Sequence, residues 1–470
     1  MALGRRKGKQ TDLFIATAQL VKGPGHPFYA KLNEVLAGAG FDDFVERLCA
    51  PHYKNGGRPS IAPGVYFRMI FIGYFEGLDS QRGIAWRCAD SLALRAFLGV
   101  ALTEATPVHA SMTIIRQRLP ADLFDKVFDF VLGLLGQKGL LGGKTLGIDA
   151  TTLEANAAMK SIVRKDSGAD WKEYLRQLAQ AEGIENPTDE DLQRLDRRRT
   201  DKKVSNEQWE SRTDADSRIA KMKDGRTHLA YKAEHAVDLK TEAIVSAHVT
   251  HADRADGPTG AESLILAQAN LMAVGSKVAV KEVVADKGYH DNRLLAQCAD
   301  WQVRTYIPER KQKNRCWTNK PDGYEAAFRA NRRRVRGAKG RRLNRWRSER
   351  CERTFAHVCE TGGGRRSWLR GLVNVSKAHV LKCAAYNLGL LLRKVGGLSK
   401  PRNWEEGAAA CFLAIWGVIV ILAIVADGMI SVLFGLCLSA TVLLGMATTA
   451  AWATSRHKAV LKYRHFSTGC

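Results

Sequence analysis

The chain has 470 residues and carries 72 Lys and Arg against 48 Asp and Glu, a formal net charge of +24. An excess of this size argues against cationic partners and indicates a polyanion, with nucleic acid first and an anionic membrane surface second. The length allows two or three domains and a large core. The ten cysteines show no Cys-x-x-Cys pair and no histidine spacing typical of zinc, so we interpret them as reduced thiols of a cytoplasmic protein.

The start of the chain is polar and basic, and no apolar segment follows it. This pattern argues against a secretory signal. Residues 1–25 are therefore predicted to form a basic arm, which either contacts DNA phosphates or is simply solvated charge.

Residues 26–139 follow a helical pattern. Apolar side chains recur at three- and four-residue steps between breaks at Gly and Pro, and arginines such as Arg116 and Arg118 lie among them. The pattern is typical of a helical DNA-binding domain of helix-turn-helix type. An ordinary helical domain with paired arginines would give the same signal.

Two short apolar runs end in an aspartate, at Asp149 and at Asp286. A β-branched run of this kind predicts a buried strand, whose carboxyl end is where open α/β sheets place their chemistry. Between the two runs, residues 154–226 are polar and charged, which predicts a surface insertion with helices at 170–182 and 189–199.

The order of signals from residue 140 to 397 predicts an α/β domain, a mixed sheet with helices packed on it. Alternating apolar positions in 229–238 and 243–249 suit an antiparallel hairpin. A further strand is expected at 302–307. The helices expected in this domain are 261–273, 292–300 and 378–395.

A third acid lies in the most basic part of the chain. Ten of the twenty residues from 331 to 350 are Lys or Arg, and Glu352 follows in a segment that suits a helix. Carboxylates from two strands and a helix can hold two divalent ions about 4 Å apart for phosphodiester chemistry. Oxygen ligands suit hard ions such as Mg2+ and Mn2+. Glu349, one turn earlier, is the alternative third ligand.

Basic residues near the acids are the expected contacts to DNA phosphates, because such contacts supply most of the affinity for a nucleic acid. The residues predicted to bind DNA are Arg345, Arg347, Arg350 and Arg353 beside the third acid, Lys287 beside Asp286, and Arg116 and Arg118 in the helical region.

Residues 405–455 are predicted to form a hydrophobic helical hairpin. Within them, 408–426 and 429–453 are almost wholly apolar, each is long enough to span a bilayer, and basic residues flank both ends. A membrane hairpin with both ends in the cytoplasm and a hydrophobic appendage that packs on protein both agree with this composition.

At these residues the sequence resembles the DDE transposases of bacterial insertion sequences, in the group whose RNase H-like catalytic domain is interrupted by an insertion. The resemblance covers residues 26–395. The segment GRPSIAPGVYFRMIFIGYFEGLDSQR is similar to the helical N-terminal domain of that group, and GIDATTLEANA, ADKGYHD and ERTFAH to its three acidic motifs. The group commonly has Arg four residues before its Glu and Lys seven after it, where Ser348 and Cys359 stand here.

The resemblance implies an α/β fold: an RNase H-like mixed sheet flanked by helices, with an all-helical N-terminal domain. It implies that Asp149, Asp286 and Glu352 bind two Mg2+ ions, for which Mn2+ can substitute. The implied reaction is cleavage at the ends of the element and joining of their 3′-hydroxyls to target DNA.

The implied partners are double-stranded DNA, namely the terminal inverted repeats of the element and the target, with a homodimer because two ends must be held together. The expected location is the cytoplasm, at the nucleoid, with a membrane tether if residues 408–453 form a true hairpin. Two alternatives are an RNase H-like nuclease without strand transfer and an inactive DNA-binding protein.

Overall fold

The computed structural model describes residues 25–54, 56, 60–200, 204–222, 225–311, 315–398 and 401. The described residues belong to one compact unit, within Met1–Arg402. The hairpin predicted at 405–455 lies outside the described residues, as does nearly all of the predicted basic arm. Among the residues that are described, no helix is both long enough and apolar enough to span a bilayer.

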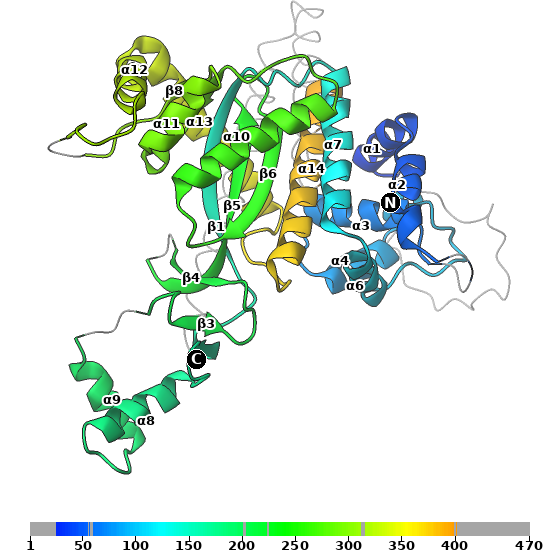
Figure 1. The fold of residues 1–470 in the computed structure, drawn as a ribbon. Coiled ribbons are helices and arrows are strands. Elements are labelled where there is room, and N and C mark those ends of the chain that lie inside the picture. Colours follow the sequence, from blue (N-terminus) through cyan, green and yellow to red (C-terminus); the bar gives the residue numbers. More distant parts are fainter. Residues whose placement is uncertain are drawn as a thin grey trace, which may run out of the picture. The chain divides into compact units, whose positions relative to one another are not determined.

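The N-terminal part is helical, as predicted (Figure 1). Ser80 and Ser91 begin two of its helices by accepting a hydrogen bond from a backbone N–H three residues later, and Pro27 and Pro63 stand in the first turn of two others. The helices are α1 (Pro27–Gly38), α2 (Phe41–Cys49), α3 (Pro63–Glu76), α4 (Gln81–Asp90), α5 (Leu92–Leu98), α6 (His109–Arg118) and α7 (Ala121–Gln137), with the 3-10 turn η2 (Ala50–His52).

A mixed sheet forms the centre of the second part, which confirms the predicted α/β class. Its strands are β1 (Thr145–Glu154), β4 (Arg218–Lys221), β5 (Thr227–Asp238), β6 (Ile244–His251), β7 (Glu282–Val284) and β8 (Arg304–Tyr306). The order is β4-β5-β1-β7-β8, and β6 also pairs with β5. β5 pairs antiparallel with β6, as the predicted hairpin requires, and antiparallel with β1 on its other side. β7 runs parallel to β1, and β8 runs parallel to β7.

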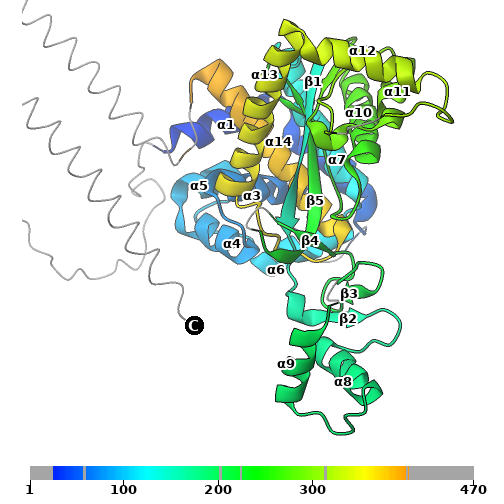
Figure 2. The same ribbon diagram turned by 90° about the vertical axis from the view of Figure 1, so that its left-hand side faces the viewer.

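Helices cover both faces of this sheet. Glu234 on β5 contacts α10, whereas its neighbour His235 contacts α13 and α14, so alternation along the strand separates the two faces. In Figure 2, β1 and β5 lie between α13 and α10. The helices are α10 (Asp256–Ala273), α11 (Asn292–Asp300), α12 (Tyr324–Arg336), α13 (Ala338–Phe355) and α14 (Leu372–Gly396), with the short turns η4 (Lys287–Tyr289) and η5 (Ala356–Thr361).

The polar insertion forms a small subdomain with its own core. It contains η3 (Met159–Ser161), the antiparallel strands β2 (Ile162–Arg164) and β3 (Trp209–Ser211), and α8 (Trp171–Ala181) and α9 (Asp189–Arg198). Both helices lie where the sequence predicts them. Their buried contacts come from Leu175, Ala179, Leu192 and Leu195.

Two aspartates of the insertion hold the start of α14. Asp214 accepts a hydrogen bond from the N–H of Gly371 at 3.0 Å, and Asp216 accepts one from the N–H of Leu372 at 2.8 Å. Negative charge at a helix N-terminus is stabilising because the free N–H groups there carry partial positive charge. Asp214 and Asp216 therefore tie the insertion to the start of α14, more than 150 residues further along the chain.

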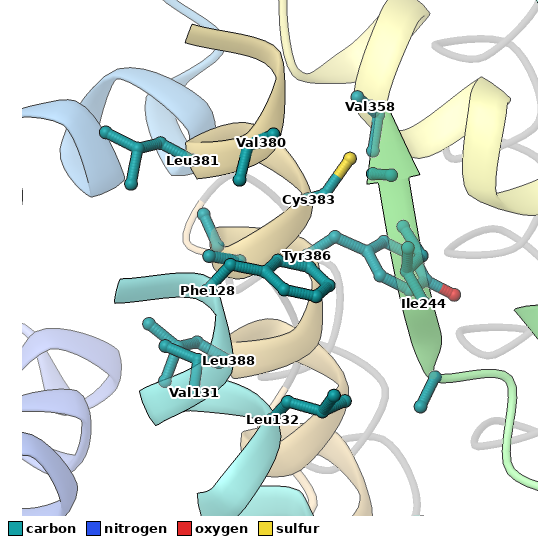
Figure 3. Packing of buried hydrophobic residues seen from close by; sticks show 14 of the residues in the cluster. Phe128, Val131, Leu132, Ile244, Val358, Val380, Leu381, Cys383, Tyr386 and Leu388 are labelled. Carbon is teal, nitrogen blue, oxygen red and sulfur yellow. The ribbon is translucent and has the colours of Figure 1, made fainter. Parts of the chain in front are cut away.

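α14 joins the helical region to the sheet. It packs against α7 on one side and against β6 on the other. Figure 3 shows Phe128, Val131 and Leu132 of α7 beside α14, with Ile244 of β6 across from them. One hydrophobic core therefore extends from the N-terminal helices to the sheet.

Asn387 is a buried polar link in this core, and its loss should destabilise the fold. Its side chain accepts from the N–H of Ile244 at 3.0 Å and donates to the C=O of the same residue at 2.8 Å. We expect Asn387→Leu to lower the free energy of unfolding by about 2–4 kcal/mol, because two buried backbone groups lose a partner. Chemical denaturation measures this. Asn270→Leu, which removes a single bond to the carbonyl of Val245, should cost less.

Candidate active site

Asp149 and Asp286 occupy matching positions on neighbouring strands. β1 and β7 run parallel, and Gly147 lies opposite Val284. Each aspartate follows two residues after this pair, so the two residues leave neighbouring strands at a similar level. Because side chains alternate along a strand, Asp149 points to the face on which Gly147 lies, whereas Asp286 lies beyond the end of β7, where this alternation no longer applies.

β1 and β7 both end at a different residue from the one that the sequence predicts. β1 does not end at Asp149 but continues to Glu154, because β5 pairs with it over nine residues. β7 ends at Val284, and Asp286 lies in the following turn, where its Oδ1 accepts from the N–H of Gly288 at 2.7 Å. An apolar run alone does not show which neighbouring strand will extend or shorten it.

α13 crosses the face that carries Asp149. A Cβ atom at Gly147 would lie 2.9 Å from Sγ of Cys351 and 3.2 Å from Cγ of Arg347, so the absence of a side chain there lets the helix approach. Nη1 of Arg347 donates to Oδ2 of Asp149 at 2.9 Å. The two side chains are only 14% and 17% exposed, so this ion pair is largely shielded from solvent.

Glu352 lies on one flank of α13. Arg347 and Cys351 mark the side of the helix that faces the sheet, and Glu352 follows about 100° further around. Ser348 shares this flank, and its hydroxyl donates to Oε1 of Glu352 at 3.0 Å. Phe355 lies on the same flank and stacks on His235, at 4.1 Å between ring centroids.

Glu349 points elsewhere. It lies about 200° from Arg347 around the helix, away from the sheet. It pairs with Arg353 at 2.5 Å, and Arg353 also binds Glu242 at 2.8 Å. Glu242 is in the turn between β5 and β6, at the end of the sheet where β1 begins. Measured from Arg347 in the same way, Glu352 lies about 140° around the helix, so the two glutamates are about 60° apart and differ in their partners, Ser348 and Arg353.

Two neutral groups lie near Asp149. Burial raises the pKa of Cys351 well above its usual value, and the charge of Asp149 adds to this effect. Burial also raises the pKa of Tyr289, helped by the charges of Glu234 and, less strongly, of Asp149. The thiol and the phenol are therefore uncharged at neutral pH, and the cation paired with Asp149 is Arg347.

A hydrogen-bonded histidine pair lies behind Asp149. His235 is opposite Asp149 in the sheet, and its Nδ1 lies 3.1 Å from Oγ1 of Thr354. That hydroxyl donates to the carbonyl of Cys351, so it accepts from His235, which leaves Nε2 to accept from Nε2 of His379 at 2.8 Å. The pair joins β5, α13 and α14 directly behind the acid.

We expect acid to destabilise the protein through this pair. Burial lowers the pKa of His379 to about 3, whereas an unfolded histidine has a pKa near 6.5. Below that pH the unfolded chain binds a proton that the folded chain does not, so the free energy of unfolding falls as the pH falls, by about 2 kcal/mol at pH 5.

The measurement is the melting temperature at neutral pH and near pH 5. His379→Gln should lose less stability on acidification than the wild type. His109→Gln, which changes an exposed histidine at the start of α6, should keep the wild-type dependence. An equal loss in His379→Gln and the wild type would contradict the prediction.

The four arginines of α13 predicted to bind DNA are placed differently. Arg345 is exposed. The guanidinium of Arg350 lies 4.5 Å from the ring centroid of Trp346, and two of its nitrogens are buried without a hydrogen-bond partner. Arg347 and Arg353 are engaged in the ion pairs described above, so neither is simply a surface contact.

The other predicted contacts also differ. Lys287 and Arg118 are exposed, and the guanidinium of Arg118 lies over the ring of Tyr53. Arg116 is only 8% exposed, and its Nε donates to Asn374 at 3.4 Å. Its position favours a link between α6 and α14 over contact with DNA.

Two further arginines lie beside the aspartates, and the sequence gives no signal for them. Nη1 of Arg365 donates to Oγ1 of Thr151 at 3.0 Å and to the carbonyl of Thr152 at 3.1 Å. Nε of Arg310 donates to the carbonyl of Lys287 at 3.1 Å, and its Nη2 donates to the carbonyl of Gly288. Each arginine holds backbone next to one acid. In a chain this rich in arginine, neither stands out.

The fold defines a class of protein, an α/β chain in which a basic helix, α13, crosses the face of the sheet that carries Asp149. Two family models match the sequence: Transposase domain (DUF772) at residues 17–118 and Transposase DDE domain at residues 200–388. The chain belongs to the DDE transposases of insertion elements, as the sequence resemblance predicts, and its general function is DNA transposition.

The second match includes Asp286 and Glu352, whereas Asp149 lies outside both matched ranges. No curated protein and no solved structure gives a significant match to the chain. The assignment of Asp149 therefore depends on the geometry of the sheet.

Proposed function

We propose that the chain cuts the ends of its element and joins the exposed 3′-hydroxyls to target DNA, with Asp149, Asp286 and Glu352 as the acids of the active site. The observation that supports this proposal is the parallel register of β1 and β7, in which Asp149 and Asp286 each follow two residues after the Gly147–Val284 pair, together with α13 lying across the face that carries Asp149. The family matches support DNA transposition as the setting.

The arrangement of the sheet supports an RNase H-like classification for the catalytic part. β5 pairs antiparallel with both β1 and β6. On the other side of β1, β7 pairs parallel with β1, and β8 pairs parallel with β7. The first strand is therefore central and has a neighbour on each side. This places the acid of β1 where a side chain from β7 and a helix laid across the face can both reach it.

The donor set suits two Mg2+ ions, for which Mn2+ can substitute. Carboxylate oxygens are the ligands that hard divalent cations prefer. Arg347 already pairs with Asp149, so the site binds positive charge. When bound, the ions would activate the attacking oxygen and stabilise the leaving oxygen of the phosphodiester. Glu352, with an oxygen held by Ser348, would complete the set from α13.

The basic surface of α12 and α13 would receive the DNA. Arg345 is exposed, so it can bind a backbone phosphate, and Arg350 is a half-buried candidate further along the same helix. The proposed partners are the terminal inverted repeats and the target DNA. Because two ends must be held together, the active form is proposed to be a homodimer on DNA, at the nucleoid. The membrane tether stays a prediction from composition.

One assay tests the reaction. The full chain is incubated with labelled terminal inverted repeats, a target plasmid and Mg2+. Joined product supports strand transfer. Nicked ends without joined product would replace the proposal with a nuclease, and a mobility shift without any cleavage would replace it with a DNA-binding protein.

A further inference from the structure

The turn that carries Asp286 is fixed to the sheet by a buried tyrosine. Tyr289 ends this turn, and its hydroxyl donates to Oε2 of Glu234 on β5 at 2.8 Å. Its ring fills the space beside Gly260 of α10, where a Cβ atom would lie 2.8 Å from the ring. The ring is therefore held by packing and the hydroxyl by a hydrogen bond.

Glu234 is unusual for a carboxylate, because it is 1% exposed in the middle of a strand. Thr259 donates to its Oε2 at 2.8 Å, and Ser263 donates to its Oε1. Lys232 is the nearby cation, at 3.6 Å, and it also binds Asp256 at 2.6 Å. A buried charge is stable only when paired and hydrogen-bonded, and here hydroxyl donors and a lysine meet that need.

This network lies on the opposite face of the sheet from Asp149. Glu234 pairs across the strands with Ala150, the residue after Asp149, and so points toward α10. Tyr289 reaches it from a turn only three residues beyond Asp286. On the outside, Arg310 binds two carbonyls of the same turn. The turn is thus clamped from both sides.

We propose that Tyr289 and Glu234 are positioning residues that hold Asp286 level with Asp149, so that both carboxylates can share a divalent cation. This inference rests on the proposed function. It predicts that loss of the hydroxyl weakens cation binding, whereas the affinity for DNA and the stability of the fold change little. Groups that orient the ligands of a metal typically contribute about 10- to 100-fold to its affinity.

The test uses the full chain and Mn2+ alone, with binding measured by calorimetry and by the Mn2+ paramagnetic resonance signal. Tyr289→Phe should bind Mn2+ about tenfold more weakly than the wild type. It should shift end DNA in gels at the wild-type concentration and melt within a few degrees of the wild type. Glu234→Gln keeps an acceptor oxygen for the phenol, so its Mn2+ affinity should fall between the two.

Tyr386→Phe is the matched control, because it removes another buried hydroxyl, whose bond to the carbonyl of Glu242 is remote from the turn. It should bind Mn2+ as the wild type does. Wild-type Mn2+ affinity in Tyr289→Phe, or an equal loss in Tyr386→Phe, would overturn the inference. If the wild type and Asp286→Asn bind Mn2+ equally weakly, the proposed function itself fails, which is a distinct result.

Discussion

Asp286→Asn should abolish cleavage of end DNA, with a loss on the order of a thousandfold, or about 4 kcal/mol of activation free energy. The substitution removes the charge that a divalent cation needs. It keeps an oxygen that can accept from the N–H of Gly288, so the turn should persist. Cleavage of labelled inverted repeats in Mg2+ measures the loss, and gel shifts should show unchanged DNA affinity.

Asp291→Asn provides the matched control. Asp291 also accepts from backbone N–H groups, those of Arg293 and Leu294, and it begins α11 five residues further on. It should cleave at close to the wild-type rate, because its carboxylate caps a helix and has no proposed contact with a cation. If Asp286→Asn cleaves as fast as Asp291→Asn, the assignment of the site is wrong.

Glu352→Gln should lose cleavage by on the order of a hundredfold or more, while Glu349→Gln stays close to the wild type. The two glutamates are one turn apart, but Glu349 is held in an ion pair with Arg353, whereas Glu352 is bound only by the hydroxyl of Ser348 among the contacts of the described residues and is the acid that we propose to bind the cation. Both variants keep the size of the side chain. Single-turnover cleavage of pre-bound end DNA separates the chemical step from binding.

The reverse order of activities would mean that α13 turns on its axis when DNA binds. Equal losses in both variants would show that charge on this helix matters and that neither carboxylate has a specific position. Thermal melting of both proteins provides the folding control, because each substitution is at an exposed position and should cost little stability.

Local sequence patterns predicted the architecture of this chain. The alternation in 229–238 and 243–249 specified the hairpin, and the order of signals specified a mixed sheet. The helices of the insertion were equally clear, because their apolar residues recur at helical spacing. These features depend on neighbours in sequence, which periodicity reports directly.

Local patterns predicted the residues of the candidate site only in part. The two aspartates could be chosen because each follows an apolar run, but the choice between Glu352 and Glu349 depends on where the axis of α13 lies on the sheet. The same limit applies to Arg347: its position in a basic run predicted a DNA contact, whereas a salt bridge to an acid 198 residues away occupies it. Such partners are set by tertiary packing, which no local pattern encodes.

Glu234 and His235 show a further limit. A histidine and a glutamate in a strand with alternating apolar positions predict a partly solvent-exposed strand. Both side chains are nevertheless buried, one on each face of the sheet. They are tolerated because α10 supplies hydroxyl partners to Glu234, whose nearby cation is Lys232 of the same strand, and because α13 and α14 supply a hydroxyl and an imidazole to His235. Apart from Lys232, these partners lie 25 to 144 positions away in the sequence, so their relevance is visible only in three dimensions.

The shared core around α14 bears on how the protein can be produced at the bench. A shortened recombinant fragment that starts after Gln137 would retain α14 but lack Phe128, Val131 and Leu132, which lie against it (Figure 3). The uncovered leucines and valines would then face water, and such a patch favours aggregation into inclusion bodies. Soluble material for crystallisation should therefore begin upstream of α1 and retain everything through α14.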